Sequence, residues 1–69
     1  MGEVEKTLLA HGVKPTAQRV VIAEYVLHTH SHPTADEVLQ AVSERLPVLS
    51  RATVYNTLHA LVEAGVLRE

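Results

Sequence analysis

Residues that begin and end helices divide this chain into four short segments, and this spacing constrains the fold more than any other feature. Thr16, Thr34 and Ser50 each precede a run with aliphatic residues at helical spacing, and Thr and Ser are favoured N-caps. Gly12 and Gly65 follow two such runs, as expected for glycine just after a helix. Helices shorter than ~12 residues are marginal in isolation. We therefore expect four helices that are stable only when packed together.

The third segment has the clearest start, because Thr34 and Glu37 have the spacing of a capping box. The expected helices cover residues 3–10, residues 17 to about 28, a segment from Thr34 to Pro47, and residues 51–64.

Aliphatic packing must supply the stability of this domain, which we expect to cover residues 1–69. The chain has no cysteine, only two aromatic residues, and 46% hydrophobic residues. Disulfides and thiolate–metal sites are therefore excluded. The side chains expected to face the core are Val4 and Leu8; Ala17, Val21, Ile22, Tyr25 and Val26; Val38, Leu39, Val42 and Leu46; and Val54, Leu58, Leu61 and Val62.

The end of the chain predicts a helix closure followed by extended backbone. Gly65 fits the left-handed position of a Schellman closure, in which Val66 packs back near Leu61. Val66 and Leu67 look like the start of a β-strand.

The distribution of charge matters more than its sum. The net charge of −2 counts against a nucleic-acid partner, because DNA binding depends on Lys and Arg. However, no acidic residue lies between Arg45 and Val62, and this window also holds Arg51 and His59. The last helix is therefore locally cationic.

The outer face of the last helix carries side chains that suit a DNA major groove. Asn56 can bond adenine through two hydrogen bonds, and Thr53 and Tyr55 can contact phosphate or a thymine methyl. Arg51 can pair with phosphate or guanine, and the free amides after Ser50 can bind phosphate. The capped helix before it would complete a helix-turn-helix. An ordinary solvated polar face remains the alternative interpretation.

Four blocks, in order and at matching spacing, carry a family resemblance. They are GVKPTAQR at 12–19, HPTADE at 32–37, SRATVYNTL at 50–58 and GVL at 65–67. Over essentially its whole length the chain resembles the DNA-binding half of the ferric uptake regulator (Fur) family. The resemblance implies an all-α, mainly helical winged helix-turn-helix whose wing hairpin is truncated or absent. It also implies a bacterial metal- or peroxide-responsive repressor that binds AT-rich palindromes in double-stranded DNA as a homodimer.

The resemblance also assigns roles to residues. It implies that Tyr55 contacts a thymine, that Asn56 contacts DNA, and that Lys14 enters the minor groove. Many iron-type members have Arg where this chain has Asn56, so the chain looks closer to the peroxide-sensing branch. Gln18 and Arg19 would serve either the DNA backbone or the packing of the domain. The predicted DNA-binding residues are Lys14, Thr16, Gln18, Arg19, Ser50, Arg51, Thr53, Tyr55, Asn56 and His59.

The histidines raise the question of metal binding. His28, His30 and His32 alternate along a short segment and could bind zinc or iron, or they could be polar residues of an exposed loop. The resemblance implies that His32 is a ligand of the regulatory metal site, Fe, Mn or Zn in the full-length protein. The other ligands, like the dimerisation domain, would lie outside this chain. We therefore expect a monomer that binds no cofactor by itself.

Other classes of function are less well supported. There is no catalytic constellation, so we expect no enzyme, and there is no signal peptide or membrane-length apolar run, so we expect a cytoplasmic protein. The competing hypotheses are a small helical protein-interaction module and a metal-binding domain built on the histidines. DNA binding predicts that Lys14, Arg19 and Arg51 converge on one face with Tyr55, whereas an interaction module predicts an exposed apolar patch.

Overall fold

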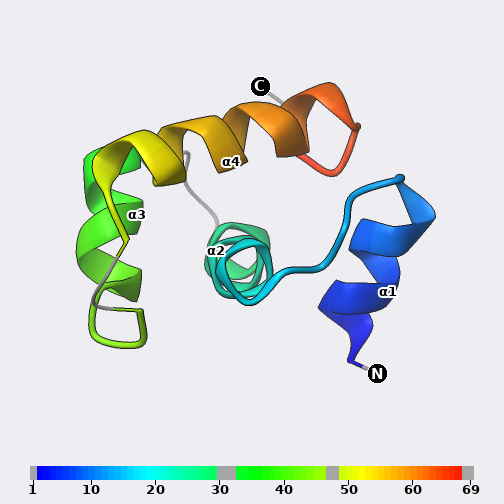
Figure 1. The fold of residues 1–69 in the computed structure, drawn as a ribbon, viewed down its shortest axis with the longest axis horizontal. Coiled ribbons are helices and arrows are strands. Elements are labelled where there is room, and N and C mark those ends of the chain that lie inside the picture. Colours follow the sequence, from blue (N-terminus) through cyan, green and yellow to red (C-terminus); the bar gives the residue numbers. More distant parts are fainter. Residues whose placement is uncertain (1, 30–32, 47–48, 68–69) are drawn as a thin grey trace.

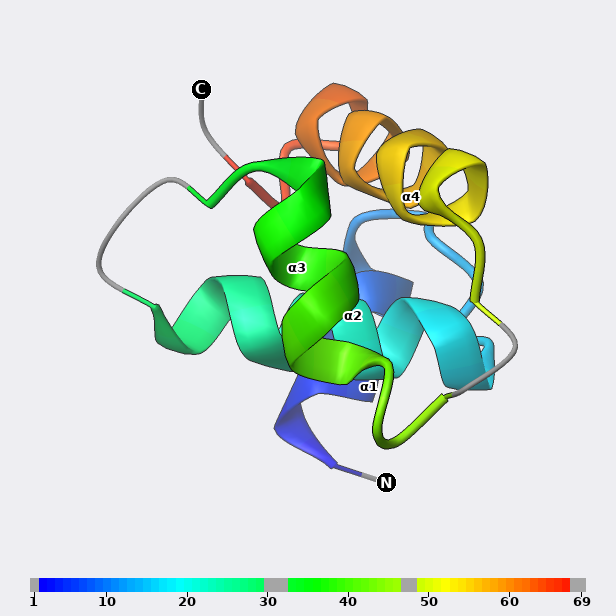
Figure 2. The same ribbon diagram turned by 90° about the vertical axis from the view of Figure 1, so that its left-hand side faces the viewer.

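The computed structural model describes residues 2–29, 33–46 and 49–67, and four helices occupy these ranges (Figure 1). They are α1 (Glu3–Ala10), α2 (Ala17–His28), α3 (Ala35–Val42) and α4 (Arg51–Glu63). Helix α2 is central and contacts each of the other three, and α3 also contacts α4. Figures 1 and 2 both place α4 at an outer edge of the molecule, where its far side is uncovered.

Each helix contributes at least one fully buried aliphatic side chain to the core. Leu8, Ile22 and Val38 come from α1, α2 and α3, and α4 supplies Val54 and Leu61, all at 0% exposure. Burying an aliphatic side chain of this size stabilises the fold by ~1.5–3 kcal/mol. The other core residues are Val13, Val21, Ala23, Val26 and Val42. The prediction of an aliphatic core is confirmed.

The three predicted N-caps begin their helices. The Thr16 hydroxyl accepts from the Arg19 amide at 3.3 Å, and the Ser50 hydroxyl accepts from the Thr53 amide at 3.1 Å. At α3 the capping box is complete. The hydroxyl of its N-cap Thr34 accepts from the Glu37 amide at 3.1 Å, and the Glu37 carboxylate accepts from the Thr34 amide at 2.8 Å.

Two glycines close α1 and α4 in the same way. Gly12 has φ 76° and Gly65 has φ 84°, a region that costs other residues ~1–2 kcal/mol. After Gly65, the Val66 amide donates to the Leu61 carbonyl at 2.9 Å, while the Gly65 amide donates to the Val62 carbonyl at 3.1 Å. These are the two hydrogen bonds of a Schellman closure, as predicted.

Helix α3 ends earlier than predicted. It ends at Val42, with turns over residues 43–45, whereas the expected end, Pro47, lies outside the described residues. The Ser43 hydroxyl donates to the Gln40 carbonyl at 3.1 Å, a local bond that competes with the helical pattern. The Leu46 amide still donates to the Val42 carbonyl at 2.9 Å, so this turn keeps half-buried Leu46 against the core.

The buried faces of α2 and α4 differ in part from the prediction. Ala17 is exposed, and Leu58 and Val62 are only half-buried. Ala23 and Thr57 are buried instead. The reason is that α4 packs against both α2 and α3. The side of α4 that faces α2 includes Thr57, which is buried there.

The prediction of a strand beginning at Val66 is wrong for the described residues. Val66 and Leu67 form bends, because the amides of both donate to the Leu61 carbonyl, at 2.9 and 3.2 Å. The described part of the chain therefore contains no strand. Its helices are also all too short or too polar to cross a bilayer.

Candidate nucleic-acid interface

The uncovered side of α4 presents the side chains that the sequence analysis selected. Arg51, Tyr55, Asn56 and His59 are exposed, Tyr55 to 65%, and Thr53 is half-buried. Tyr55 is the most exposed large hydrophobic side chain among the described residues, ahead of Leu9 at 49%, so its ring is available to a partner. The first turn of α4 holds no acidic residue, and Glu63 is the only acid in the helix.

A groove runs between the first turn of α2 and one flank of α4. Its polar lining includes Gln18, Arg19, Thr53 and Asn56, with Thr16 at the N-cap of α2. These side chains offer amide, guanidinium and hydroxyl donors, and the positive end of the α2 dipole lies at the same place. The groove therefore suits an anionic group such as a phosphate.

Thr57 is a member of this groove that the sequence analysis missed. It is 7% exposed, and none of the described residues forms a hydrogen bond with its hydroxyl. Because no buried polar side-chain atom of the described residues lacks a partner, this hydroxyl is open to water at the groove. The sequence signal was a small polar residue three positions after Val54 and four before Leu61, within an otherwise aliphatic stripe.

Two of the cations lie together beside the groove. The Arg19 side chain donates from Nη1 to the Lys14 carbonyl at 3.2 Å, and the same carbonyl accepts from the Thr16 amide at 3.0 Å. Lys14 and Arg19 also line a second hollow, next to Ala60 and Glu63 of α4. The loop before α2 therefore lies beside the C-terminal half of α4.

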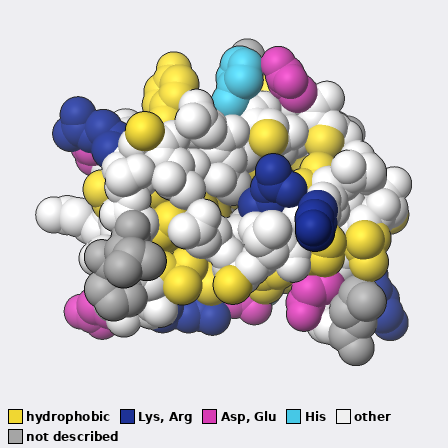
Figure 3. Space-filling view, in the orientation of Figure 1, with side chains coloured by type: hydrophobic (Ala, Val, Ile, Leu, Met, Phe, Trp, Pro, Cys, Tyr) yellow, Lys and Arg dark blue, Asp and Glu magenta, His cyan; other side chains and the backbone are white. Residues whose placement is uncertain are grey.

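Arg51 has a different neighbour. Its Nε lies 2.7 Å from Oδ1 of Asp36, in the first turn of α3, and both side chains are mostly exposed. Figure 3 shows the Lys and Arg side chains around α4 in two groups, one near its beginning and one below its C-terminal half. The prediction that all three cations converge on one face with Tyr55 is therefore wrong, because Lys14 and Arg19 lie together beside α2 whereas Arg51 lies on the α3 side.

Tyr55 also lies toward α3. It lines a shallow hollow with Ala35, Leu58, His59 and Val62. His59 Nε2 lies 3.1 Å from the carboxylate of Glu63, one turn later. The outer face of α4 therefore forms a ridge with Tyr55 and Asn56 on its opposite flanks. Tyr55 lies toward α3, and Asn56 lies toward the groove beside α2.

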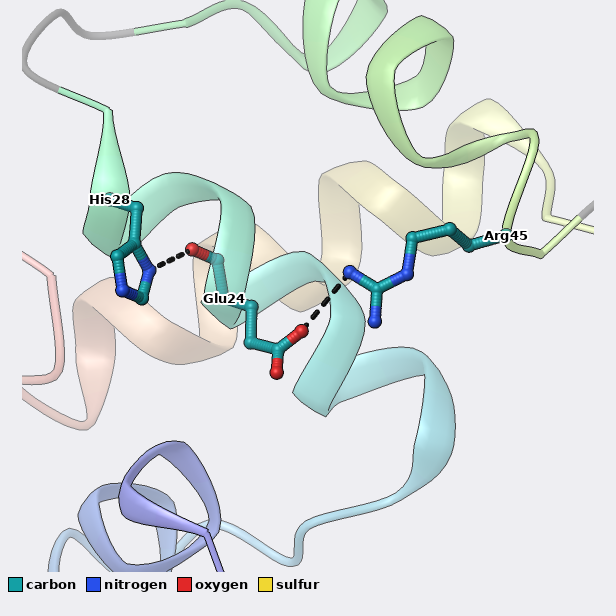
Figure 4. Close-up of polar contacts among 3 residues, drawn as sticks. All are labelled: Glu24, His28 and Arg45. Atoms are coloured by element: carbon teal, nitrogen blue, oxygen red, sulfur yellow. Dashed lines mark hydrogen bonds and ion pairs between the residues drawn. The ribbon is translucent and has the colours of Figure 1, made fainter.

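The histidine segment is only partly described. His28 donates from Nδ1 to the Glu24 carbonyl at 2.7 Å, and the Glu24 carboxylate lies 3.1 Å from Arg45, as Figure 4 shows. His30 and His32 lie outside the described residues. Within the described ranges, no three His, Cys, Asp or Glu side chains form a group that could hold a metal ion.

Comparison with known proteins settles the family. Residues 10–69 match the model of the ferric uptake regulator family. This chain belongs to the ferric uptake regulator family. The predictions that the chain is a DNA-binding domain of this family and that it is not an enzyme are therefore confirmed. The N-terminal domain of the family is a winged helix, and helices α1 to α4 are its helical part.

Relatives within this family include the peroxide-responsive repressor PerR of Staphylococcus epidermidis, 47% identical over 58 residues. PerR of Staphylococcus aureus strains USA300 and COL is 45% identical over the same number of residues. Each match covers 84% of this chain and 39% of the relative, so this ferric uptake regulator domain spans well under half the length of these relatives. The family binds regulatory metals and DNA operators.

Proposed function

We propose that this chain is the operator-binding domain of a peroxide-responsive repressor and that α4 enters the major groove of double-stranded DNA. The main support for this proposal is the outer face of α4. This face is free of acidic residues through the first three turns of α4 and has Tyr55, 65% exposed, in the second turn. The major groove is wide enough for one helix, whose first turns meet the base edges.

The residues around α4 divide into base-reading and backbone-binding sets. Tyr55 and Asn56 read base edges from opposite flanks of the ridge, and His59 follows one turn later. Lys14 enters an AT-rich minor groove, where the narrow walls increase the negative potential. The backbone-binding set is Thr16, Gln18, Arg19, Ser50 and Thr53, and Arg51 contacts the DNA from the first position of α4.

The operator is an AT-rich palindrome, and the longer protein binds it as a homodimer with one domain on each half-site. A single copy of this chain is a monomer that binds a half-site weakly, because linking two domains adds avidity. His32 is one ligand of a regulatory Fe, Mn or Zn site whose other ligands come from the longer protein, which is cytoplasmic.

Binding isotherms test this function. The chain should bind a labelled AT-rich palindromic duplex more tightly than a scrambled duplex, and both affinities should fall as salt rises. Replacing Arg45, which pairs with Glu24 away from α4, with Gln is the control and should change neither affinity by more than about twofold. Equal affinity for the two duplexes would contradict sequence-specific binding. No binding at low salt would favour a protein partner.

A further inference from the structure

The pair between Arg51 and Asp36 is the closest ion pair among the described residues. The Nε–Oδ1 distance is 2.7 Å, compared with 3.1 Å for the Arg45–Glu24 pair. It connects the first residue of α4 to the first turn of α3. Both side chains are more than 60% exposed, so the ion pair is accessible to solvent at the edge of the proposed DNA-binding surface.

Helix stability does not explain why an arginine occupies this position. A cation at the N-terminus of a helix opposes the helix dipole, and exposed ion pairs contribute little to folding. Asp36, by contrast, is favourable at the N-terminus of α3. Arg51 therefore imposes a small cost on α4 that Asp36 offsets, which points to a use of the guanidinium outside the domain.

The closest contact in the pair is made through Nε, on the side edge of the guanidinium. The closest contact joins Nε to Asp36, and no ion pair joins Arg51 to any other described acidic residue. The two terminal nitrogens form a fork that matches two acceptors side by side. Arg51 precedes Tyr55 by four residues, so the fork lies one helical turn before the exposed aromatic ring on the same side of α4.

We propose that Asp36 is a positioning residue that holds Arg51 so that its fork reads O6 and N7 of a guanine next to the base pair contacted by Tyr55. This inference rests on the proposed function. Guanine is favoured over phosphate because Asp36 cancels most of the charge that would attract a phosphate, while it leaves the directional fork intact. Holding the side chain also lowers the entropy lost on binding.

Selection from a randomised duplex library tests this positioning role. The unmodified chain should enrich guanine at one position in each half-site. Asp36→Asn should lower that guanine preference by about tenfold, the scale of a bidentate base contact. The same variant should bind random DNA more tightly, with a steeper dependence on salt, because the released Arg51 is then free to pair with phosphate. A purely structural role would not change base preference and salt dependence in opposite directions.

A double-mutant cycle shows whether Asp36 acts through Arg51. Arg51→Gln should lose the same guanine preference, and adding Asp36→Asn to it should cause no further loss. Glu24→Gln is the matched control, because it removes one acid from an exposed pair on another part of the molecule and should leave the preference unchanged.

Two results would overturn the proposal. One is an Asp36→Asn variant that enriches guanine as strongly as the unmodified chain. The other is an Arg51→Gln variant that keeps the guanine preference while its salt slope falls by ~0.9, the value of one lost phosphate contact. If the unmodified chain enriches no sequence at all, the proposed function fails instead.

Discussion

Arg19 donates from Nη1 to the backbone carbonyl of Lys14 at 3.2 Å, so one cation fixes the loop that carries the other. The Lys14 side chain itself is exposed. Its backbone is held by two hydrogen bonds to its carbonyl, the second from the Thr16 amide, while its ammonium group is left to solvent. A held backbone with a free charge is the arrangement expected of a residue that reaches into a DNA groove.

Replacing Lys14 with Ala should weaken binding to specific and random DNA alike. One cation near phosphate is lost, so the slope of log affinity against log salt should fall by ~0.9. Anisotropy titrations at several salt concentrations measure this slope. Lys6→Ala, which removes an exposed cation from α1, is the control and should keep the slope of the unmodified chain. A Lys14 variant with an unchanged slope would contradict the groove contact.

Replacing Tyr55 with Ala should weaken binding to the palindrome by ~1–3 kcal/mol, the scale of one base contact. Binding to scrambled DNA should change little, because the ring is exposed and supports no part of the core. Isotherms with both duplexes give the two values. Leu9, 49% exposed on α1, provides a control, since Leu9→Ala removes exposed apolar area elsewhere. An equal loss on both duplexes would show that Tyr55 does not read sequence.

Replacing Thr57 with Val should separate stability from binding. No buried polar side-chain atom lacks a partner in the described part of the chain, so the Thr57 hydroxyl reaches water in the groove; valine, nearly isosteric and more apolar, should raise the free energy of unfolding in urea by less than ~1 kcal/mol. Affinity for DNA should fall, because the groove loses a hydroxyl that can hydrogen-bond a phosphate. Thr7→Val is the control, since the Thr7 hydroxyl already donates to the Glu3 carbonyl and should yield no stabilisation. Unchanged affinity together with higher stability would remove Thr57 from the interface.

Replacing Thr34 with Ala should lower the free energy of unfolding by ~1 kcal/mol, because one half of the capping box of α3 is lost. Urea denaturation measures the change. Ala41 is exposed late in α3, and Ala41→Ser, which alters that helix without touching a cap, should cost clearly less. A Thr34 variant as stable as the unmodified chain would show that the box contributes nothing.

Local sequence signals predicted the helix beginnings, because an N-cap needs only the residues that follow it. Thr16, Thr34 and Ser50 all cap as expected. The end of α3 was harder to predict, since the helix ends at Val42, where the Ser43 hydroxyl donates to the Gln40 carbonyl, rather than near the proline in the sequence. Gly65 was predictable because the left-handed conformation is rare for other residues.

Contacts between helices were the least predictable part of the site. The Arg51–Asp36 pair joins residues fifteen positions apart on two helices, and no local pattern encodes that distance. The burial of Thr57 likewise depends on how far α4 turns toward α2. The outer face of α4 could be predicted because hydrophobic periodicity identifies the opposite side.

A nuclear magnetic resonance titration of the isotopically labelled chain tests the central claim most directly. An AT-rich palindromic duplex and a scrambled duplex of equal length should be compared at two salt concentrations. We predict that shifts concentrate on Lys14 and on residues 50–59, and that the palindrome saturates them at lower concentration. If neither duplex shifts these residues even at low salt, α4 is not a DNA-reading helix and the account is contradicted.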